Sequence, residues 1–394
     1  MSTYEDNDIK LTPWSAKGKF TSEKYQRLIE QFGVESFDDD LLVRFEKVTG
    51  HKPHYLMRRG IFFAHRKLKD ILDDYEKKIP IFLYTGRGPS GEFHLGHMVS
   101  FIFTAWLQKV FGAVVVIQIS DDEKYHFKDL EWKFIYEMGF ENAKDMIACG
   151  FDPEKTFIFS HRDYCGERCV IDLANESWKH INVNHVQKIF GLPDNCSIGM
   201  INWPVYQSIA AFSKYYTEIF GATSNYRCLV AYAIDQDPYF RLCRELAPKL
   251  NLHKPCSIMC TFLPALSGNE KMSTTGSSPT IFMKDTEKEI MDKVKKYAFS
   301  GGQETKELHQ KIGGNLDVDI SYQYLRYFEP NDDILEKVGK EYSSGKMLTG
   351  EIKKIMSETV AKFILDHQQK CSQVTSDMVK KFYDLKKFSH KTLD

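Results

Sequence analysis

Short apolar runs that alternate with helical patterns constrain the fold of this chain more than any other sequence feature. Each run is only a few residues long and ends at turn-forming residues, which is typical of a buried strand in a parallel sheet. The five runs cover residues 79–85, 113–120, 156–160, 228–234 and 256–263. Because helical patterns lie between them, the order predicts an α/β fold with a doubly wound, Rossmann-type parallel sheet.

The distribution of these patterns predicts three domains. Residues 1–78 are expected to form a mostly helical N-terminal extension. Residues 79–283 are expected to form the sheet domain, with a mostly helical insertion at about 164–226. Residues 284–394 are expected to form an all-helical domain, whose last helix either stays within it or packs back on the sheet domain.

Several helix ends can be placed from single residues. Gly33 and Gly50 follow apolar residues at helical spacing and are expected to end the first two helices of the extension. A third helix is expected over residues 61–75. Thr286 and Glu289 have the spacing of a capping box and predict the first helix of the C-terminal domain.

Composition excludes several classes of protein. Lys and Arg number 53 and Asp and Glu number 54, which gives a net charge of -1 and argues against a dedicated DNA-binding protein. Residues 1–10 are polar, and no run of 18 apolar residues occurs. We therefore expect no signal peptide, no membrane span and a cytoplasmic protein.

The nine cysteines do not have the spacing of zinc ligands. The nearest pairs are Cys165/Cys169 and Cys256/Cys260, and no paired CxxC motif occurs. The sequence therefore predicts reduced, mostly buried thiols and no protein metal site.

Residues 86–91 (GRGPSG) match the GxGxxG fingerprint of dinucleotide-binding proteins directly after a predicted strand, and Asp121 closes the next strand. In that fingerprint the helix begins within the glycines. Here Pro89 interrupts the turn, and the helical pattern begins only near Leu95. A dehydrogenase is therefore the weaker interpretation of this segment.

The later helix start places His94 and His97 at a helix N-terminus, where backbone amides attract phosphate. Being three residues apart, the two imidazoles share one face and can donate to phosphate oxygens. Gly96 leaves room for a flat base or a phosphate to approach the backbone. Taken alone, the pair could equally be two incidental surface histidines or two ligands of an HxxH metal site.

A polar loop at residues 268–278 is the second candidate phosphate-binding segment. It follows the last predicted strand and contains Lys271, Met272, Ser273, Thr274 and Thr275. A mobile lysine can bind the outer phosphates as charge develops on them, and the hydroxyls can donate to phosphate oxygens. In isolation this segment would be interpreted as an ordinary Ser/Thr-rich loop.

Together, HLGH at residues 94–97 and KMSTT at residues 271–275 resemble the HIGH and KMSKS signatures of class I aminoacyl-tRNA synthetases. The chain most closely resembles the tryptophanyl-tRNA synthetases of eukaryotic type, over nearly all of residues 12–387. The most specific segments are RRGIFFAH at 58–65, YTGRGP at 84–89, SDDEKY at 120–125, AIDQDPYFR at 233–241 and AFSGG at 298–302.

The resemblance implies roles for individual residues. Tyr84 and Gln118 would bond the indole nitrogen of tryptophan. Glu123 and Gln236 would hold its ammonium group, and Arg87 would contact ATP. A pocket that presents acceptors to the indole N–H rejects phenylalanine, because the polar groups would then stay unpaired. Without the resemblance, these residues would be interpreted as strand-end polar groups bonded to the nearby backbone or as a surface charge.

The implied activity is that of a tryptophan–tRNA ligase that uses ATP, with Mg²⁺ bound to ATP and not to a dedicated protein site. His94, His97, Lys271 and Ser273 would be catalytic, and Gly96, Met272 and Thr275 would also contact ATP. The implied partners are L-tryptophan, tRNA(Trp) and a second copy of the chain, and residues 284–394 would bind the anticodon arm.

The sequence departs from the family pattern at two places, and three other protein classes remain as alternatives to a tryptophan–tRNA ligase. The turn between residues 89 and 94 is one residue shorter than usual, and Thr274 and Thr275 replace the usual end of the signature loop. The alternatives are a tyrosyl-tRNA synthetase, a small nucleotidyltransferase with the same HxGH helix, and a non-catalytic relative that kept the fold.

Overall fold

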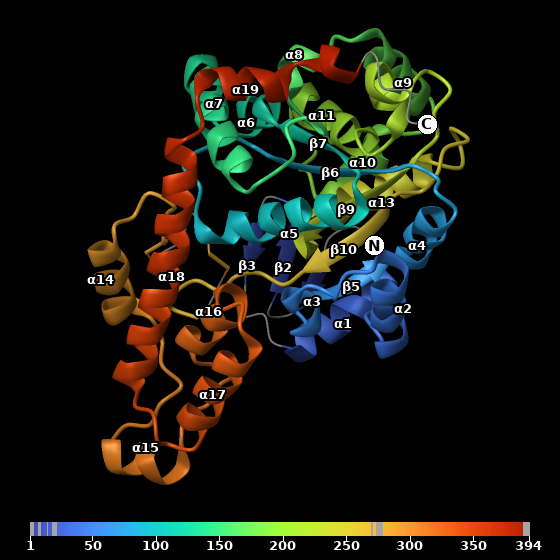
Figure 1. Cartoon of the computed structure of the whole chain (residues 1–394). Helices are drawn as coiled ribbons and strands as arrows, with labels where there is room; N and C mark the ends of the chain where they lie inside the picture. Colours follow the sequence, from blue (N-terminus) through green and yellow to red (C-terminus); the bar gives the residue numbers. More distant parts are fainter. Residues whose placement is uncertain are drawn as a thin grey trace.

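The computed structural model describes residues 4–6, 9–13, 15–17, 22–268, 271–272 and 279–388. An α/β body contains the main sheet, and a column of helices from the C-terminal residues extends from one side of it (Figure 1). The chain therefore divides into a sheet-containing part and a helical part, as the sequence patterns indicate.

Seven strands form the main sheet: β4 (Glu35–Ser36), β5 (Phe62–Arg66), β6 (Ile81–Arg87), β7 (Val114–Ile119), β8 (Thr156–Ser160), β9 (Arg227–Ala233) and β10 (Cys256–Cys260). Their order is β4-β5-β10-β9-β6-β7-β8. The five strands β8, β7, β6, β9 and β10 are parallel, whereas β5 is antiparallel to β10 and β4 is antiparallel to β5. The five predicted strands and the doubly wound fold class are confirmed.

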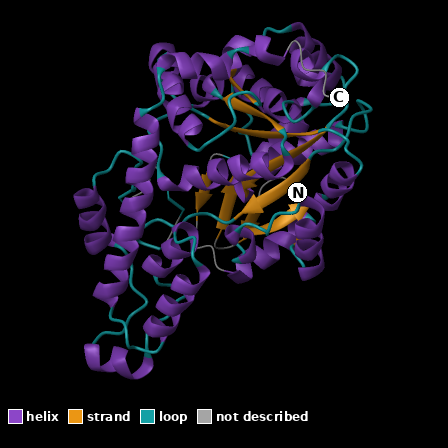
Figure 2. Ribbon diagram, in the orientation of Figure 1, coloured by secondary structure: helices purple, strands orange, loops and turns teal. Residues whose placement is uncertain are grey.

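Helices cover both faces of this sheet, which explains why every residue of β7 and β8 is buried (Figure 2). Alternate side chains enter two separate cores: Leu83 and Val115 face one, and Phe82 and Tyr84 face the other. The first core contains side chains of α4 (Leu68–Glu76), α5 (Leu95–Phe111) and α7 (Trp132–Ala148). The second contains side chains of α9 (Arg168–Trp178), α10 (Val183–Phe190), α11 (Ile198–Ile209) and α13 (Asp237–Leu246).

The N-terminal residues are less helical than the sequence suggests. The two expected helices are present as α1 (Ser22–Phe32) and α2 (Asp39–Thr49), and Gly33 and Gly50 follow them with positive φ. Before them, β1 (Tyr4–Asp6), β2 (Ile9–Thr12) and β3 (Ser15–Lys17) form a small antiparallel sheet that the sequence analysis did not foresee.

The helix predicted over residues 61–75 is wrong in its first half. Residues Phe62–Arg66 are strand β5, which pairs with β10 and extends the main sheet. Lys67 then takes a left-handed conformation with φ 54°, and only α4 is helical. A short apolar run does not distinguish a buried strand from a buried helix by periodicity, so the sequence pattern could not resolve this segment.

The C-terminal helices are α14 (Glu287–Tyr297), α15 (Lys306–Ile312), α16 (Ile320–Phe328), α17 (Asp332–Ser343), α18 (Thr349–Ser372) and α19 (Ser376–Tyr383). The capping box of Thr286 and Glu289 opens α14 as predicted. Helix α18 packs along α14 and α16 and also against α7, and α19 packs on β8 and α7 (Figure 1). The helical part is thus joined to the sheet-containing part by α18 and α19.

Short elements connect these pieces: α3 (Tyr55–Arg58), α6 (Asp121–Phe127), α8 (His161–Tyr164), α12 (Thr217–Phe220) and the 3-10 turns η1 (Ser213–Tyr216), η2 (Ile234–Gln236) and η3 (Leu385–Phe388). Within the described ranges, no helix has the length and apolar character needed to cross a bilayer.

Candidate active site

A cavity of about 600 Å³ opens where the carboxyl ends of β6 and β9 meet the N-terminus of α5. Its lining includes nine of the residues singled out from the sequence: Tyr84, Arg87, His94, Gly96, His97, Glu123, Gln236, Lys271 and Met272. Gln118 is bonded to Tyr84 from behind the lining. Ser273, Thr274 and Thr275 lie outside the described residues.

His94 is the N-cap of α5, and both imidazoles of the HLGH segment are held by backbone amides. The Gly96 N–H donates to His94 Nδ1 at 3.1 Å, and the His94 N–H donates to His97 Nδ1 at 3.3 Å. The two rings stack with their centroids 3.5 Å apart. Since Nδ1 accepts in both rings, the neutral imidazoles carry their proton on Nε2, which leaves an N–H donor on each ring for a ligand.

Burial keeps these two imidazoles uncharged. Burial, assisted by the nearby positive charges of Arg87 and Lys271, lowers the pKa of His94 to about 3. The same causes place the pKa of His97 well below its ordinary value. The pair therefore supplies neutral hydrogen-bond donors near pH 7, at a helix end where the backbone dipole already favours an anion.

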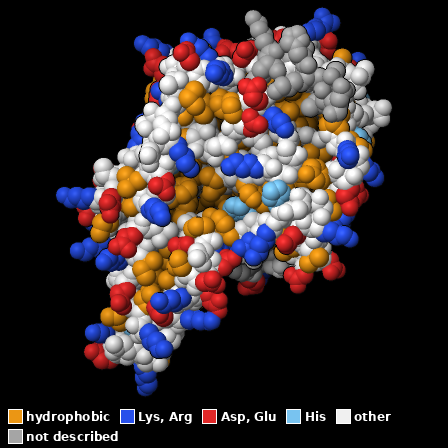
Figure 3. Space-filling model, in the orientation of Figure 1, with side chains coloured by type: hydrophobic (Ala, Val, Ile, Leu, Met, Phe, Trp, Pro, Cys, Tyr) orange, Lys and Arg blue, Asp and Glu red, His pale blue; other side chains and the backbone are white. Residues whose placement is uncertain are grey.

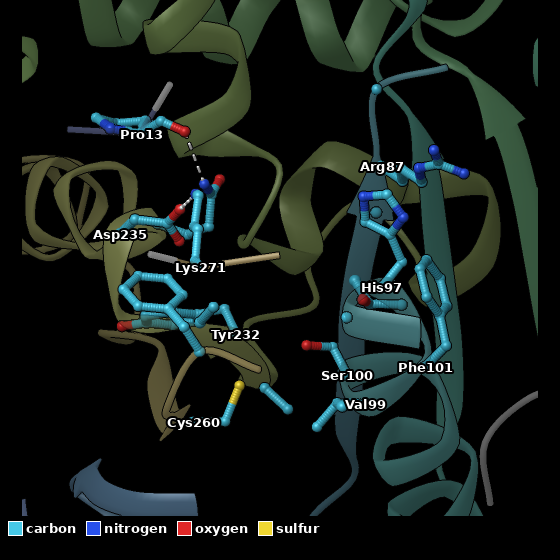
Figure 4. A pocket seen from close by; sticks show the side chains of 18 of the residues that line it. Pro13, Arg87, His97, Val99, Ser100, Phe101, Tyr232, Asp235, Cys260 and Lys271 are labelled. Carbon is cyan, nitrogen blue, oxygen red and sulfur yellow. Dashed lines mark hydrogen bonds and ion pairs between the residues drawn. The ribbon is translucent and has the colours of Figure 1, made fainter. Parts of the chain in front are cut away.

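Lys271 lies on the wall opposite His97 (Figure 4). Its Nζ is 2.6 Å from Asp235 Oδ2 and stands 5.1 Å from the centroid of the Phe262 ring. The backbone next to it is fixed, because the Met272 N–H donates to the Leu263 carbonyl at 2.9 Å. An ammonium group therefore faces the imidazoles across one cavity, as the sequence analysis required.

Arg87 orders the turn between β6 and α5. Its guanidinium donates to Asn142 Oδ1 at 2.8 Å and to the carbonyls of Gly91 and Glu92, each at 2.9 Å. It also lies 4.1 Å from the centroid of the Phe93 ring, and burial lowers its pKa to about 9. In this conformation the side chain holds the shortened turn in place, so a direct contact with ATP stays a prediction.

The deep end of the cavity presents amide and phenol groups among buried aromatic side chains. The Tyr84 hydroxyl donates to Gln118 Oε1 at 2.6 Å. Sheet register explains this contact, because Tyr84 pairs with Val116 and Gly86 with Gln118, which makes Tyr84 and Gln118 diagonal neighbours on one face. Gln118 Nε2 and the Oε1 of Gln207 are buried without a protein partner.

Gln207 is a site residue that the sequence analysis missed. It lies on α11, lines the cavity and interacts with the Tyr84 hydroxyl. No local motif marks it, because α11 comes from the helical insertion and reaches the sheet only in the folded structure. Its signal in the sequence is one glutamine in a strongly apolar helix.

The remaining predicted residues, Glu123 and Gln236, also line the cavity. Glu123 is 8% exposed, and its Oε2 is 2.9 Å from Lys124 Nζ. Gln236 lies in η2 and donates through Nε2 to the Pro13 carbonyl at 3.1 Å. Asp235 was also missed as a site residue: besides holding Lys271, it keeps Oδ1 buried without a partner.

A buried polar network positions α6, the helix that carries Glu123. Asp122 accepts from Trp203 Nε1 at 2.9 Å and lies 2.5 Å from His161 Nδ1. His161 Nε2 lies 2.8 Å from the Tyr215 hydroxyl. These groups fix the acidic turn against the insertion helices, so the SDDEKY segment owes its placement to residues far along the chain.

The two ends of the cavity favour different chemical groups. One end offers two imidazole N–H donors, a helix N-terminus and an ammonium group, which suit a polyphosphate. The other end offers buried acceptors between aromatic rings, which suit a flat ligand with a single N–H donor. The arrangement can therefore hold a phosphate chain and a small aromatic molecule side by side.

Comparison with known proteins agrees with this geometry. The model of the family described as tRNA synthetases class I (W and Y) matches residues 76–364. The cytoplasmic tryptophan–tRNA ligase of Oryctolagus cuniculus is 47% identical over 96% of this chain and 80% of its own length. The Homo sapiens protein of that name is also 47% identical, over 96% of this chain and 81% of its own length.

A solved structure of similar shape supports the same conclusion. The tryptophanyl-tRNA synthetase of Plasmodium falciparum is 41% identical and aligns with a TM-score of 0.86, covering 92% of this chain and 95% of that one. The chain is therefore a class I tRNA synthetase and belongs to the tryptophan–tRNA ligase family.

Proposed function

We propose that this protein is a cytoplasmic tryptophan–tRNA ligase. It activates L-tryptophan with ATP to give tryptophanyl-AMP and pyrophosphate, and then transfers the tryptophanyl group to the 3′ end of tRNA(Trp), releasing AMP. One observation carries the proposal: the neutral imidazoles of His94 and His97 and the ammonium of Lys271 face one cavity, whose other end is built by Tyr84 and Gln118.

Tryptophan is recognised at the deep end. Tyr84 donates to Gln118, so the phenol oxygen keeps its lone pairs free to accept from the indole N–H. The Gln207 side chain interacts with the Tyr84 hydroxyl, and its buried Oε1 is a further acceptor. Glu123 and Gln236, which line the same cavity, bind the ammonium group of the substrate, and Gln236 exchanges its bond to Pro13 for the ligand.

The first step joins the tryptophan carboxylate to the α-phosphorus of ATP. The carboxylate oxygen attacks, and the bond to the pyrophosphate oxygen breaks. His94 and His97 donate through Nε2–H to phosphate oxygens, while Lys271 leaves Asp235 and binds the departing phosphates together with Ser273 and Thr275. Gly96 lets the nucleotide approach the backbone, and Met272, packed in the wall, keeps Lys271 in register. These contacts stabilise charge that grows in the transition state.

The second step transfers the tryptophanyl group. A ribose hydroxyl of the tRNA attacks the carbonyl of tryptophanyl-AMP, the new ester bond forms and AMP leaves. No side chain acts as a nucleophile, because both steps depend on positioning and on charge stabilisation. The substrate is the magnesium complex of ATP. The described carboxylates of the cavity, Glu123 and Asp235, are each paired with a lysine and form no cage for the ion.

The proposed dimer and the proposed binding of tRNA are supported by membership of the tRNA synthetase family. Residues 284–394 bind the anticodon arm, and residues 79–283 catalyse both steps. Residues 1–78 contribute β4 and β5 to the same sheet, and two chains form the working enzyme. Lys and Arg nearly balance Asp and Glu over residues 284–394. On the face drawn in Figure 3, charges of both signs are interspersed. Recognition of tRNA therefore depends on shape and on individual contacts more than on a strongly basic surface.

ATP–pyrophosphate exchange tests the proposal. We expect exchange that depends on tryptophan and is at least a hundredfold slower with tyrosine, because Gln118 is a neutral amide and would have to accept a phenol without the charge of a carboxylate. Charging of a tRNA(Trp) transcript tests the second step. Exchange that depends on tyrosine, or no exchange with either amino acid in a folded protein, would overturn the proposal.

A further inference from the structure

A second cluster of reactive side chains lies outside the cavity, where α18 packs against α7. Asp145 comes from α7, and His367 and Cys371 come from α18. One ligand atom from each lies within 4.8 Å of the others. His367 is buried, while Asp145 and Cys371 are half-buried, so the three groups converge at a point that solvent can still reach.

Residue spacing along α18 and α7 brings the side chains of the cluster together. His367 and Cys371 are four residues apart and therefore share one face of α18. On α7, Asp145 is four residues before Cys149, the residue that ends the helix. The Cys149 thiol donates to the Asp145 carbonyl at 3.4 Å, and its pKa is raised mainly by burial and further by Asp145 and Cys371. Asp145 on α7 thus faces the His367–Cys371 pair of α18 across a helix contact.

The distances among the three groups fit a small tetrahedral metal ion. His367 Nε2 is 3.2 Å from Asp145 Oδ1, Cys371 Sγ is 3.3 Å from His367 Nε2, and Cys371 Sγ is 3.6 Å from Asp145 Oδ1. Tetrahedral Zn²⁺ with ordinary bond lengths to nitrogen, oxygen and sulfur separates its ligand atoms by about 3.4–3.6 Å. An ion can therefore enter with shifts of only a few tenths of an ångström.

We propose that Asp145, His367 and Cys371 bind one Zn²⁺ ion and that this ion crosslinks α18 to α7. The fourth position is taken by water from the open side. Thiolate, imidazole and carboxylate are the ligand types that zinc selects. Sequence spacing did not suggest this site, because its ligands form no CxxC motif and lie on two helices that are more than 200 residues apart in the chain.

Neighbouring charged groups affect the protonation of the Cys371 thiol, which must be deprotonated to bind the ion. Burial, with the charge of Asp145, raises the pKa of Cys371 to about 12, so the thiol must lose a proton when the metal binds. Lys144 lies close enough to stabilise a thiolate at Cys371, and its own charge is partly offset by Glu141 at 2.7 Å.

Cobalt titration of the reduced, full-length protein tests the site after chelator treatment and buffer exchange. Co²⁺ replaces Zn²⁺ in tetrahedral sites and reports a bound thiolate through a sulfur-to-cobalt charge-transfer band. We expect one Co²⁺ per chain, the charge-transfer band, intense visible bands of tetrahedral coordination, and loss of all three on addition of Zn²⁺. A parent protein without a charge-transfer band would overturn the proposal.

Three variants and one control separate the ligands from other thiols. Cys371→Ser should abolish the charge-transfer band, whereas Asp145→Asn and His367→Gln should keep a thiolate signal but weaken binding at least tenfold. Cys196→Ser changes a half-buried cysteine that packs in the other core and should behave like the parent. An unchanged titration in Cys371→Ser or in Asp145→Asn would contradict the proposal. If Cys371→Ser does not fold, the titration of Asp145→Asn, whose side chain keeps its shape, tests the zinc site alone.

Thermal unfolding gives an independent readout. Zn²⁺ that binds only the folded chain raises the Tm with its concentration. The increase is expected in the parent and in Cys196→Ser, and it should be absent in Cys371→Ser. An equal increase in all three proteins would assign the metal to another site and overturn the proposal.

Discussion

At the scale of single residues, hydrogen bonds from the backbone determine which atoms of the two histidines face the cavity. His94 and His97 use Nδ1 to accept backbone amides, which directs Nε2–H toward the cavity. The sequence predicted their place at a helix N-terminus but not the ring nitrogen that each presents. Gln207 escaped prediction altogether, because its role depends on the packing of α11 against the sheet.

The buried histidines predict how stability depends on pH. The pKa of His94 is lowered to about 3, so between pH 3 and 6.5 the folded state binds fewer protons than the unfolded chain. The free energy of unfolding therefore falls as the pH drops below about 6.5 and is unaffected by this group above it. At pH 5 the loss is about 2 kcal/mol for one such histidine. His94→Gln should lose less stability than the parent between pH 7 and pH 5 in urea unfolding; an equal loss would place the titration elsewhere.

Gln207 predicts a selective effect on the amino acid. Gln207→Leu removes a buried acceptor at the deep end, so the Kd for tryptophan should rise about tenfold, as expected for one lost hydrogen bond. The Kd for ATP should stay unchanged. Gln187→Leu, on α10 outside the cavity lining, is the matched control. Equal losses for both substrates would mean that the substitution disturbs the fold.

At the scale of elements, the sequence located the parallel strands because their apolar runs are distinct and their connections are helical. It failed at β5, where an aromatic-rich run that lies between β4 and β10 resembles a helix over the same length. It also failed to foresee β1–β3, whose strands have only three or four residues each. Local patterns thus predicted elements whose burial is uniform. They missed β5, whose partner β10 is distant in the chain, and the very short strands that pair only with one another.

The close contact between β6 and β7 gives an element-scale prediction. A Cβ at Gly86 would lie 2.6 Å from the Gln118 carbonyl oxygen, whereas a Cβ at Gly91 would meet nothing within 4 Å. Gly86→Ala should therefore push β6 from β7, lower the Tm by several degrees and weaken tryptophan binding through Tyr84 and Gln118. Gly91→Ala should leave both quantities near the parent values. Two variants with the same Tm would show that the strands tolerate the methyl group.

At the scale of the whole molecule, the site joins segments that are far apart in the chain. His94, at the start of α5, and Tyr84, within β6, are ten residues apart in the sequence, and the resemblance to the family indicated Lys271 as their counterpart. Only the fold shows Lys271 on the opposite wall, paired with Asp235. We propose that Lys271 exchanges Asp235 for the phosphates and binds them most tightly as charge grows in the transition state.

Single-turnover formation of tryptophanyl-AMP by Lys271→Ala tests this account most directly, with Lys284→Ala as the control. Lys284 is an exposed lysine that is also paired with a carboxylate, at 2.9 Å from Glu92. The account predicts that Lys271→Ala slows adenylate formation by about 10²–10³-fold, while the Kd for tryptophan changes less than twofold and Lys284→Ala behaves like the parent. Equal rates in Lys271→Ala and the parent, or a matching loss of tryptophan affinity, would contradict it.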